Sequence, residues 1–295
     1  MKPLLFVKSV GAGNDFVVLD NRSGAVGRAA AASRHVLGSK DRVASVRRTQ
    51  AGLSTLARRL CHRQLGIGAD GLLLVERPDR GSGADFRLRI FNPDGSEPTM
   101  CVNGARCVAL YAHAQRIAPR AMTFQTGAGP VRAQVTDQRV RLAIYQPKDW
   151  RVVPGVTVNG RRLTGYYLHT GVPHLVLFPS SLDRLDVARW GRLLRRSPRF
   201  RPGGVNVNFA AVRDAHHVRL RTYERGVEAE TLACGSGAIA TALAASRVRG
   251  ARSPVAVQTT GRERLEVSWD GRDEAIRNVC LTGPTRLVYE GRIQV

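Results

Sequence analysis

The sequence predicts an α+β chain in two halves, dominated by short strands and with one central helix in each half. Most apolar runs have the length of a strand, such as residues 72–75, and Gly-rich turns separate them. A Cys-led helix start also occurs twice, at Cys101 and at Cys234, and an Ala-rich apolar run follows each cysteine. This repeat indicates a two-lobed molecule in which each lobe presents one thiol.

The composition is that of a folded protein without a membrane span. The chain has 295 residues, of which 43% are hydrophobic, enough for one large domain or two of ordinary size. The longest apolar stretches are strand-sized, and the N-terminal run reads as a first strand rather than a signal peptide. We therefore expect a cytoplasmic protein with no membrane partner.

The chain is strongly basic, with a net charge of +23, and only four of its basic residues are lysines. The arginines are spread through predicted strands and helices, without a dense block or interleaved aromatic residues. We do not expect nucleic acid as a partner. A basic binding protein that keeps the fold without the chemistry is one alternative that the charge leaves open.

In the first half, residues 4–20 predict a strand, a Gly-rich turn and a second strand. Residues 23–50 are rich in Ala, Arg and Ser, and we expect a solvated insertion there, partly helical or disordered. A short amphipathic helix follows over 53–62. Strands are then predicted over 72–76, 86–91, 121–126, 131–136 and 139–145, with a helix from about Cys101.

The second half repeats this style. Strands are predicted over 165–170, 174–178, 206–213, 217–223, 255–260, 264–269, 276–281 and 285–289, and helices over 184–195 and 235–247. The two halves look like diverged copies. The Cys-led segments indicate this, and we also expect residues 13–16 to correspond to residues 205–209.

A thiol at a helix N-terminus is suited to proton transfer. The unpaired N–H groups and the positive end of the dipole there favour a thiolate, and they lower the thiol pKa from about 8.5. The Gly and Ser after Cys234 also leave these N–H groups open to a carboxylate. Two such thiols on opposite faces of one carbon can invert it, because one removes a proton while the other returns one. Cys101 and Cys234 are therefore the candidate catalytic pair.

The other cysteines lack this context. The chain has five cysteines without the spacing of a disulfide framework, and we expect reduced thiols. Cys61, Cys107 and Cys280 are expected to be packing residues. No Cys or His spacing favours zinc, so no metal site is predicted.

No cofactor is predicted either. Pyridoxal phosphate needs a Schiff-base lysine, and none of the lysines lies in a convincing pocket context. There is no P-loop, and Gly11-Ala12-Gly13 lacks the further Gly and the helix of a dinucleotide site. The candidate chemistry is therefore that of a cofactor-free racemase acting on a small-molecule amino acid.

Several polar residues could support the thiols. Glu224 suits a substrate amine or the tuning of a thiol, and Arg225 suits a carboxylate, with a surface ion pair as the alternative. His174 is a candidate modulator of a thiol pKa, with a core histidine as the alternative. Asparagines that lie in turns or at strand ends, where a plain turn role is the alternative, are Asn14, Asn92, Asn103 and Asn206.

Together these segments resemble the diaminopimelate epimerase family. The matching segments follow the family's order over nearly the whole chain, apart from residues 23–50. They are residues 11–16, 65–71, 89–97, 100–107, 171–174 and 223–238. The resemblance implies two pseudo-symmetric lobes, each a strand-rich sheet wrapped around a central helix, with the active site in the cleft between the lobes.

The resemblance also implies boundaries and an activity. An N-terminal lobe of residues 1–145 would carry Cys101 and receive the returning strand of residues 284–295, and a C-terminal lobe of residues 146–283 would carry Cys234. The implied activity is that of a homodimeric isomerase, independent of pyridoxal phosphate. It would interconvert LL- and meso-diaminopimelate in the biosynthesis of lysine and peptidoglycan precursors.

The resemblance implies roles for single residues. Cys101 and Cys234 would be catalytic, and His174 and Glu224 would tune their pKa. The substrate would be bound by Asn14, Asn92, Val102, Asn103, Asn206, Glu224 and Arg225, and by the backbone N–H groups of Gly235 and Ser236.

Two positions depart from the family pattern. Val102 stands where Gly is usual, and a β-branched residue there is costly if the position needs a positive φ or a close approach of the ligand. Val172 stands where Asn is frequent. Both changes remove polarity or room near the ligand, so a racemase of another amino acid, such as histidine, that uses the same cysteine pair remains the second hypothesis.

Overall fold

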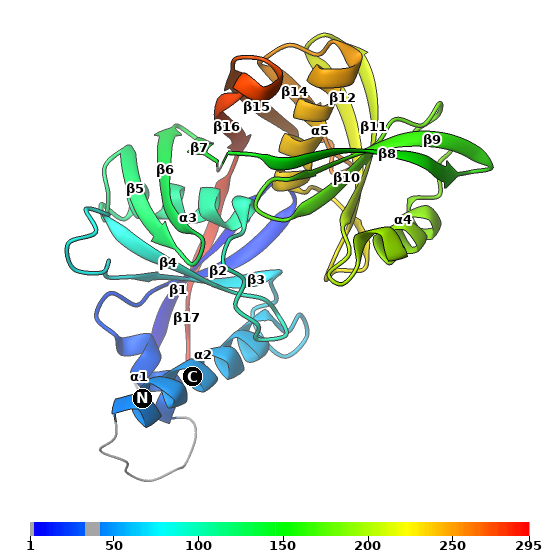
Figure 1. Cartoon of the computed structure of the whole chain (residues 1–295). Helices are drawn as coiled ribbons and strands as arrows, with labels where there is room; N and C mark the ends of the chain where they lie inside the picture. Colours follow the sequence, from blue (N-terminus) through cyan, green and yellow to red (C-terminus); the bar gives the residue numbers. More distant parts are fainter. Residues whose placement is uncertain (1–2, 33–41, 145, 295) are drawn as a thin grey trace. The chain divides into compact units, whose positions relative to one another are not determined.

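The computed structural model describes residues 3–32, 42–144 and 146–294, and the chain divides into two compact units (Figure 1). Unit 1 comprises residues 1–142 and 285–295, and unit 2 comprises residues 143–284. The last strand therefore belongs to the same unit as the first.

Unit 1 is a strand-rich sheet with one enclosed helix and two outer helices. Its elements are β1 (Leu4–Gly11), β2 (Asn14–Asp20), α1 (Ala25–Ala32), α2 (Arg42–Cys61), β3 (Gly71–Glu76), β4 (Phe86–Phe91), α3 (Val102–Ala114), β5 (Ala121–Thr126), β6 (Gly129–Thr136), β7 (Arg139–Ala143) and β17 (Arg286–Ile293). The strands pair in the order β17–β1–β2–β3–β4–β5–β6–β7.

Unit 2 has the same plan. Its elements are β8 (Lys148–Val158), β9 (Arg161–His169), β10 (Pro173–Leu177), α4 (Val187–Arg195), a 3-10 turn (Pro198–Phe200), β11 (Asn206–Asp214), β12 (His217–Glu224), β13 (Ala229–Thr231), α5 (Gly235–Arg249), β14 (Val255–Gln258), β15 (Arg264–Asp270), a 3-10 turn (Asp273–Ala275) and β16 (Arg277–Pro284). The strands pair in the order β8–β9–β10–β11–β12–β14–β15–β16, and β13 adds to β12.

The two units repeat one another in strand direction. In each order the successive pairs run antiparallel, antiparallel, parallel, antiparallel, parallel, antiparallel and antiparallel. The central helix enters at the same point of both orders, because α3 follows β4, and α5 follows β12 and the short added strand β13. The predicted α+β class with pseudo-symmetric halves is confirmed.

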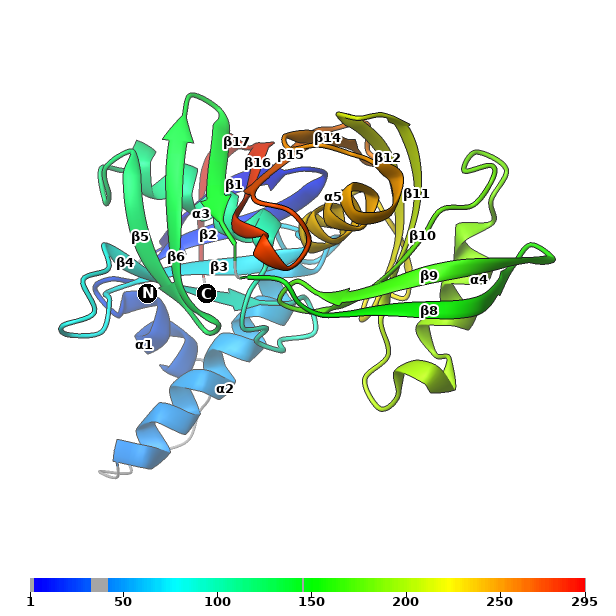
Figure 2. The same ribbon diagram turned by 45° about the horizontal axis from the view of Figure 1, so that its top comes forward.

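Each sheet wraps around its central helix, as the strands around α5 show (Figure 2). Both helices are buried along most of their length and are rich in Ala and Gly, for example residues 237–245 of α5. A helix with small side chains on all sides can be enclosed closely by strands. The predicted helices near Cys101 and over 235–247 are therefore the cores of their units.

The outer helices of unit 1 confirm one part of what was expected for residues 23–50 and contradict another. Helical structure is confirmed for the described part, since α1 and the start of α2 lie there. The expectation that this segment is solvated is wrong for α1, because Val26 and Ala30 are buried in one cluster with Leu53 and Leu60. Ala and Gly let the two helices approach closely. The sequence did not predict this contact, because these small residues give only a weak hydrophobic pattern. Residues 33–41 lie outside the described residues.

The structure differs from the sequence analysis at two further points. The long strand β8 was not predicted, because its burial follows no regular alternation and its pairing with β9 is irregular at two points. The correspondence of residues 13–16 with residues 205–209 is wrong. His174 in β10 pairs with Asn206 in β11 as Phe16 in β2 pairs with Gly71 in β3, so residues 206–209 correspond to β3.

Candidate active site

Cys101 caps the N-terminus of α3. Its backbone is extended, with φ −138° and ψ 114°, and the N–H of Gly104 donates a hydrogen bond to its Sγ over 3.4 Å. The thiol is partly exposed, while the helix behind it is buried. A capping sulfur that accepts from a backbone N–H is placed where a thiolate is favoured.

Cys234 has the same place in unit 2. It precedes α5 with φ −125° and ψ 111°, and its Sγ lies 3.5 Å from Ser236 Oγ. Its backbone conformation therefore matches that of Cys101 closely. Gly235 and Ser236 are the first residues of α5, where backbone N–H groups have no partner within the helix. They can bind a carboxylate.

The third residue after each cysteine is a glycine for a steric reason. A Cβ at Gly237 would lie 2.5 Å from Asn208 Oδ1 and 3.3 Å from Cys234 Sγ. A Cβ at Gly104 would lie 3.0 Å from Leu73 Cδ2. The strand registers put Leu73 and Asn208 at corresponding positions, so both units use the same close approach of strand to helix.

Val102 carries no backbone strain. It is the first residue of α3, and its φ is not among the positive values of the chain. Of the two conditions under which a β-branched residue would be costly, the positive φ is therefore not met. Val172 precedes β10, and its carbonyl accepts a hydrogen bond from the N–H of Thr170 over 3.1 Å.

Two of the predicted asparagines of unit 1 lie together. Asn103 Nδ2 donates to Asn14 Oδ1 over 2.6 Å, and Asn14 Nδ2 donates to Asp70 Oδ2 over 3.0 Å. Arg106, which is fully buried, donates from Nη2 to Asn103 Oδ1 over 2.9 Å. Asn92 lies in a separate turn after β4, where its Nδ2 donates to Ser96 Oγ over 2.9 Å.

The carboxylate end of this cluster is held by cations. Arg63 contacts both Asp15 and Asp70, over 2.8 Å and 2.7 Å. Lys8 pairs with Asp15 over 2.7 Å. Burial alone would raise the pKa of Asp15, but the hydrogen bonds from Arg63 and Lys8 outweigh it and lower that pKa to about 2.

His174 is completely buried in β10, and its protonation is determined by its neighbours. Asn208 Nδ2 donates to the Leu175 carbonyl over 3.2 Å and contacts His174 Nδ1 over 3.0 Å, while Thr222 donates to Asn208 Oδ1. His174 Nδ1 must therefore accept, so the proton is on Nε2. Burial, together with smaller contributions from the nearby charges of His169 and Arg225, lowers the pKa of His174 to about 3. Nε2 has no hydrogen-bond partner among the described residues.

The other predicted residues of unit 2 follow β12. The backbone N–H of Arg225 donates to Asn206 Oδ1 over 2.7 Å, and Thr231 donates to Glu224 Oε2 over 3.1 Å. The registers give Phe91 and Tyr223 corresponding positions, and Asn92 and Glu224 are the residues that directly follow them. The two units therefore offer different chemistry at equivalent points, an amide in one and a carboxylate in the other.

Sequence reasoning missed Arg106, Asp70 and Asn208. A signal existed for Asn208, because Asn206 and Asn208 are two apart in one strand and so point to the same face. A buried asparagine in a strand needs partners, and His174 and Thr222 supply them. Arg106 and Asp70 had no local signal, since their contacts join separate elements of unit 1.

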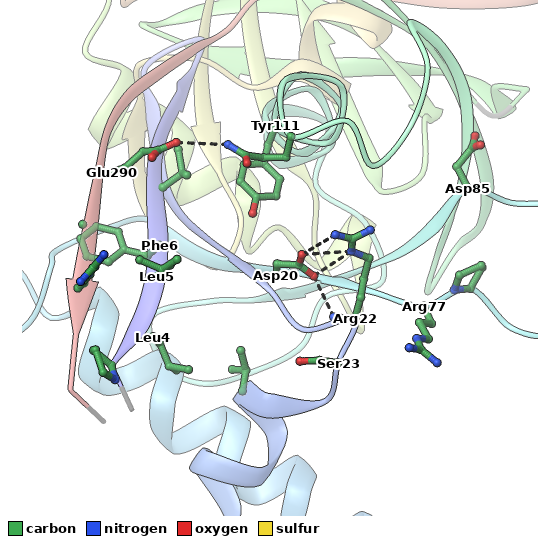
Figure 3. Close-up of a pocket in the computed structure, with 17 residues that line it drawn as sticks. Leu4, Leu5, Phe6, Asp20, Arg22, Ser23, Arg77, Asp85, Tyr111 and Glu290 are labelled. Carbon is green, nitrogen blue, oxygen red and sulfur yellow. Dashed lines mark hydrogen bonds and ion pairs between the residues drawn. The ribbon is translucent and has the colours of Figure 1, made fainter. Parts of the chain in front are cut away.

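A pocket in unit 1 does not contain the predicted residues. It has a volume of about 1160 Å³, and Figure 3 shows Tyr111, Asp20, Arg22 and Glu290 around it. Tyr111 lies near the C-terminal end of α3, roughly 15 Å along the helix axis from Cys101. Burial raises the pKa of Tyr111 to about 12. This pocket is therefore distinct from the surroundings of the thiol.

Among the described residues, no group of His, Cys, Asp and Glu side chains is arranged to hold a metal ion. No helix in the described ranges is long and apolar enough to cross a membrane.

Comparison with known proteins identifies relatives over nearly the full chain. The family model for diaminopimelate epimerase matches residues 6–147 and 166–288. The diaminopimelate epimerase of Aquifex aeolicus is 35% identical over 294 residues, covering 98% of this chain and 97% of that protein. That of Chlorobaculum tepidum is 37% identical and covers 96% of this chain and 98% of its own.

Solved structures show the same fold at low identity. A hydroxyproline epimerase from Agrobacterium vitis, with bound trans-4-hydroxy-L-proline, has a TM-score of 0.68 at 17% identity and covers 99% of this chain and 91% of its own. A phenazine biosynthesis protein of the PhzF family from Bacillus anthracis has a TM-score of 0.69 at 14% identity and covers 100% of both chains. The fold is that of the PhzF and proline racemase type of epimerase.

Proposed function

We propose that this chain, which belongs to the diaminopimelate epimerase family and is therefore an isomerase, interconverts LL- and meso-diaminopimelate with Cys101 and Cys234 as its two proton-transfer groups. The observation that carries the assignment of the pair is their shared geometry. Each cysteine is the residue immediately before the buried central helix of its unit and has the same extended backbone conformation. The relatives give no support to a different amino acid as substrate.

The proposed reaction is a proton exchange at one α-carbon. One sulfur, as thiolate, takes the α-proton and becomes a thiol, and the electron pair of the broken C–H bond stays on the carbon next to the carboxylate. The other sulfur, as thiol, gives its proton to the opposite face and becomes a thiolate. The return reaction uses the same groups in exchanged roles, so the mechanism requires both sulfurs at one substrate carbon.

The helix termini support this chemistry. We assign to the backbone N–H groups of Gly235 and Ser236 the carboxylate beside the reacting carbon, where negative charge develops, because N–H groups at a helix N-terminus favour an anion. We assign to Arg225 a carboxylate contact and to Glu224 the substrate amine. The amides of Asn14, Asn92, Asn103 and Asn206, with Val102, are assigned to binding the rest of the molecule.

His174 and Glu224 are proposed to tune the thiols. The neutral His174 carries its proton on Nε2, and this buried donor has no hydrogen-bond partner among the described residues. A buried N–H without a partner is costly, so it favours a nearby anion. A thiolate or the substrate carboxylate would satisfy it.

We also propose that the reaction is independent of pyridoxal phosphate. Lys8 is buried in a salt bridge with Asp15, and its ammonium also donates to the Gly68 carbonyl. It is therefore engaged in the fold of unit 1 and is not placed to form a Schiff base. Borohydride, which reduces a Schiff base, is expected to leave the activity unchanged.

A homodimer in the cytoplasm completes the proposal, on the basis of the family resemblance. Sedimentation equilibrium is expected to give twice the chain mass of 32.2 kDa. A mass of one chain at micromolar concentration would contradict the dimer and leave the chemistry as proposed.

The test is proton exchange in heavy water. The reduced protein is incubated with LL-diaminopimelate, and NMR follows the loss of the α-proton signal and the appearance of the meso isomer. We expect Cys101→Ala and Cys234→Ala each to slow epimerisation at least ~100-fold, since each removes one proton-transfer group. Cys61→Ala is the matched control. Burial raises the pKa of the Cys61 thiol to about 12, and Cys61 packs in the cluster of buried side chains that α1 and α2 form against the sheet of unit 1, here called the outer core. Full turnover in either catalytic variant would exclude the two-thiol mechanism.

A further inference from the structure

We infer that Arg106 and Asp70 are positioning residues that fix which way the side-chain amides of Asn103 and Asn14 face. The inference rests on the proposed function, in which these amides bind substrate. Neither Arg106 nor Asp70 is assigned to the substrate itself, and they act from the two ends of one hydrogen-bonded chain within unit 1.

This series of hydrogen bonds has one direction, from a group that can only donate, Arg106, to a group that can only accept, Asp70. Arg106 Nη2 donates to Asn103 Oδ1 over 2.9 Å, and a guanidinium has no acceptor. Asn103 Nδ2 then donates to Asn14 Oδ1 over 2.6 Å, and Asn14 Nδ2 donates to Asp70 Oδ2 over 3.0 Å. Reversing either amide would bring two donors together at one of its contacts and two acceptors together at the other.

Burial makes the direction costly to reverse. Arg106 is fully buried and Asn103 is 4% exposed, so water cannot replace a mismatched partner there. Gly11 lets the turn between β1 and β2 approach α3 at this place. A Cβ on it would lie 3.1 Å from the Asn103 carbonyl oxygen and 2.9 Å from Cys107 Sγ.

The carboxylate end is anchored separately. Asp70 Oδ1 accepts from Arg63 over 2.7 Å, and Asp70 Oδ2 also accepts from the backbone N–H of Asp15 over 3.2 Å. Asn103 follows Cys101 by two residues in the first turn of α3. These hydrogen bonds therefore fix one amide in the first turn of α3, two residues after Cys101, and a second amide at the start of β2, before any substrate is bound.

The direction in which Asn14 faces should be reversible by placing an acceptor at residue 103 and a donor at residue 70. With Asn103→Asp, residue 103 can only accept, so Asn14 must turn and then presents its oxygen to Asp70, where two acceptors meet. Asp70→Asn supplies a donor at that point and relieves the conflict. The double variant should therefore restore the hydrogen bonds between positions 103, 14 and 70 with Asn14 facing the opposite way, and it gives up only the 3.2 Å contact from the Asp15 N–H.

The experiment is a double-mutant cycle on the full-length protein, with both melting temperature and steady-state kinetics measured for each variant. We expect Asn103→Asp to cost less stability when Asp70→Asn is present than when it is absent. KM for diaminopimelate should rise about tenfold in Asn103→Asp and stay raised in the double variant, because a reversed Asn14 presents the wrong group to the substrate. Stability and KM that both recover, or strictly additive effects on stability, would overturn the inference.

A second pair of variants tests the other end. Arg106→Lys keeps a donor toward Asn103 Oδ1, whereas Arg106→Met keeps the bulk and removes the donor. We expect KM to rise in Arg106→Met and to be partly rescued in Arg106→Lys; equal KM values in the two variants would contradict the role of Arg106. Failure of the wild type to epimerise diaminopimelate would remove the proposed function. The melting temperatures of the double-mutant cycle would still support or overturn the inference that the direction of the two amides is fixed.

Discussion

At the scale of single residues, His174 is the group whose ionisation the fold determines most clearly. Burial lowers its pKa to about 3, and Asn208 leaves the proton on Nε2. We therefore expect nitrogen NMR of the imidazole to show an unprotonated Nδ1 and a protonated Nε2 throughout pH 5 to 8 in the folded protein. A titration of His174 within that range would contradict this assignment.

The same shift has a consequence for stability against pH. The unfolded histidine takes up a proton below about pH 6.5, whereas the folded one stays neutral until about pH 3. The contribution of His174 is thus complete above pH 6.5 and is lost as the pH falls. Wild type should lose about 1 kcal/mol more than His174→Gln between pH 7 and pH 5.5, measured by urea unfolding. Parallel pH curves would show that His174 is not buried neutral.

The glycines after the two cysteines allow a matched comparison. Gly237→Ala places a Cβ 2.5 Å from the oxygen of Asn208, whose amide is held by hydrogen bonds and cannot easily move. We expect this variant to lose about 2 kcal/mol of stability and much of its activity. Gly104→Ala meets only the methyl end of Leu73, and higher helix propensity offsets part of the cost. Equal melting temperatures for the two variants would contradict the argument.

Residues of the candidate site differ in how far the sequence predicts them. Cys101 and Cys234 could be found because the pattern around them occurs twice. Arg106 and Asp70 could not, because an arginine in a helix and an aspartate in a turn are usually solvated. Their meaning depends on β1, β2 and α3 packing together, which no local spacing reveals.

At the scale of elements, the crossing of α1 and α2 was the feature hardest to anticipate. A Cβ on Gly52 of α2 would lie 2.6 Å from the Ala30 carbonyl oxygen of α1, which is backbone and cannot yield. We expect Gly52→Ala to destabilise the protein by about 1–3 kcal/mol, although alanine is the better helix former.

The control is Thr55→Ala, at an exposed position of the same helix, which should stay within about 0.5 kcal/mol of wild type. Thermal unfolding of the two variants decides. A stabilised Gly52→Ala would mean that the helices do not cross at this point. The kcat of both variants at low temperature should be unchanged, because the crossing lies on the outer side of unit 1, against β2 and β3 rather than α3.

Strands and helices with regular patterns were predicted well, and the reasons for the exceptions are physical. β6 alternates buried and exposed residues, as a sheet with one open face requires, and the prediction over 131–136 agrees. β8 lacks that alternation and contains Pro154 and Gly155, which read as turn residues. α1 buries Val26, Gly27 and Ala30, and a hydrophobicity pattern does not reveal the burial of such small residues.

At the scale of the whole molecule, strand direction shows the duplication more clearly than residue identity. The shared asparagines suggested that residues 13–16 match residues 205–209, yet register pairs His174 with Asn206 as it pairs Phe16 with Gly71. Side chains diverged while hydrogen-bond directions were retained, because reversing one strand would break its pairing with both neighbours. The units therefore share a scaffold, and each contributes different side chains to the proposed reaction.

The proposed reaction makes a redox prediction for the molecule as a whole. Two thiols that serve one carbon must come close enough for mild oxidation to join Cys101 to Cys234, and the disulfide removes both proton-transfer groups. We expect oxidised protein to lose activity, to yield the linked peptides on mapping, and to recover on reduction. Cys61→Ala should behave as wild type, since the Cys61 thiol is buried in the outer core of unit 1. Inactivation with both thiols still free would mean that oxidation acts elsewhere, and the two-thiol mechanism would lose its geometric premise.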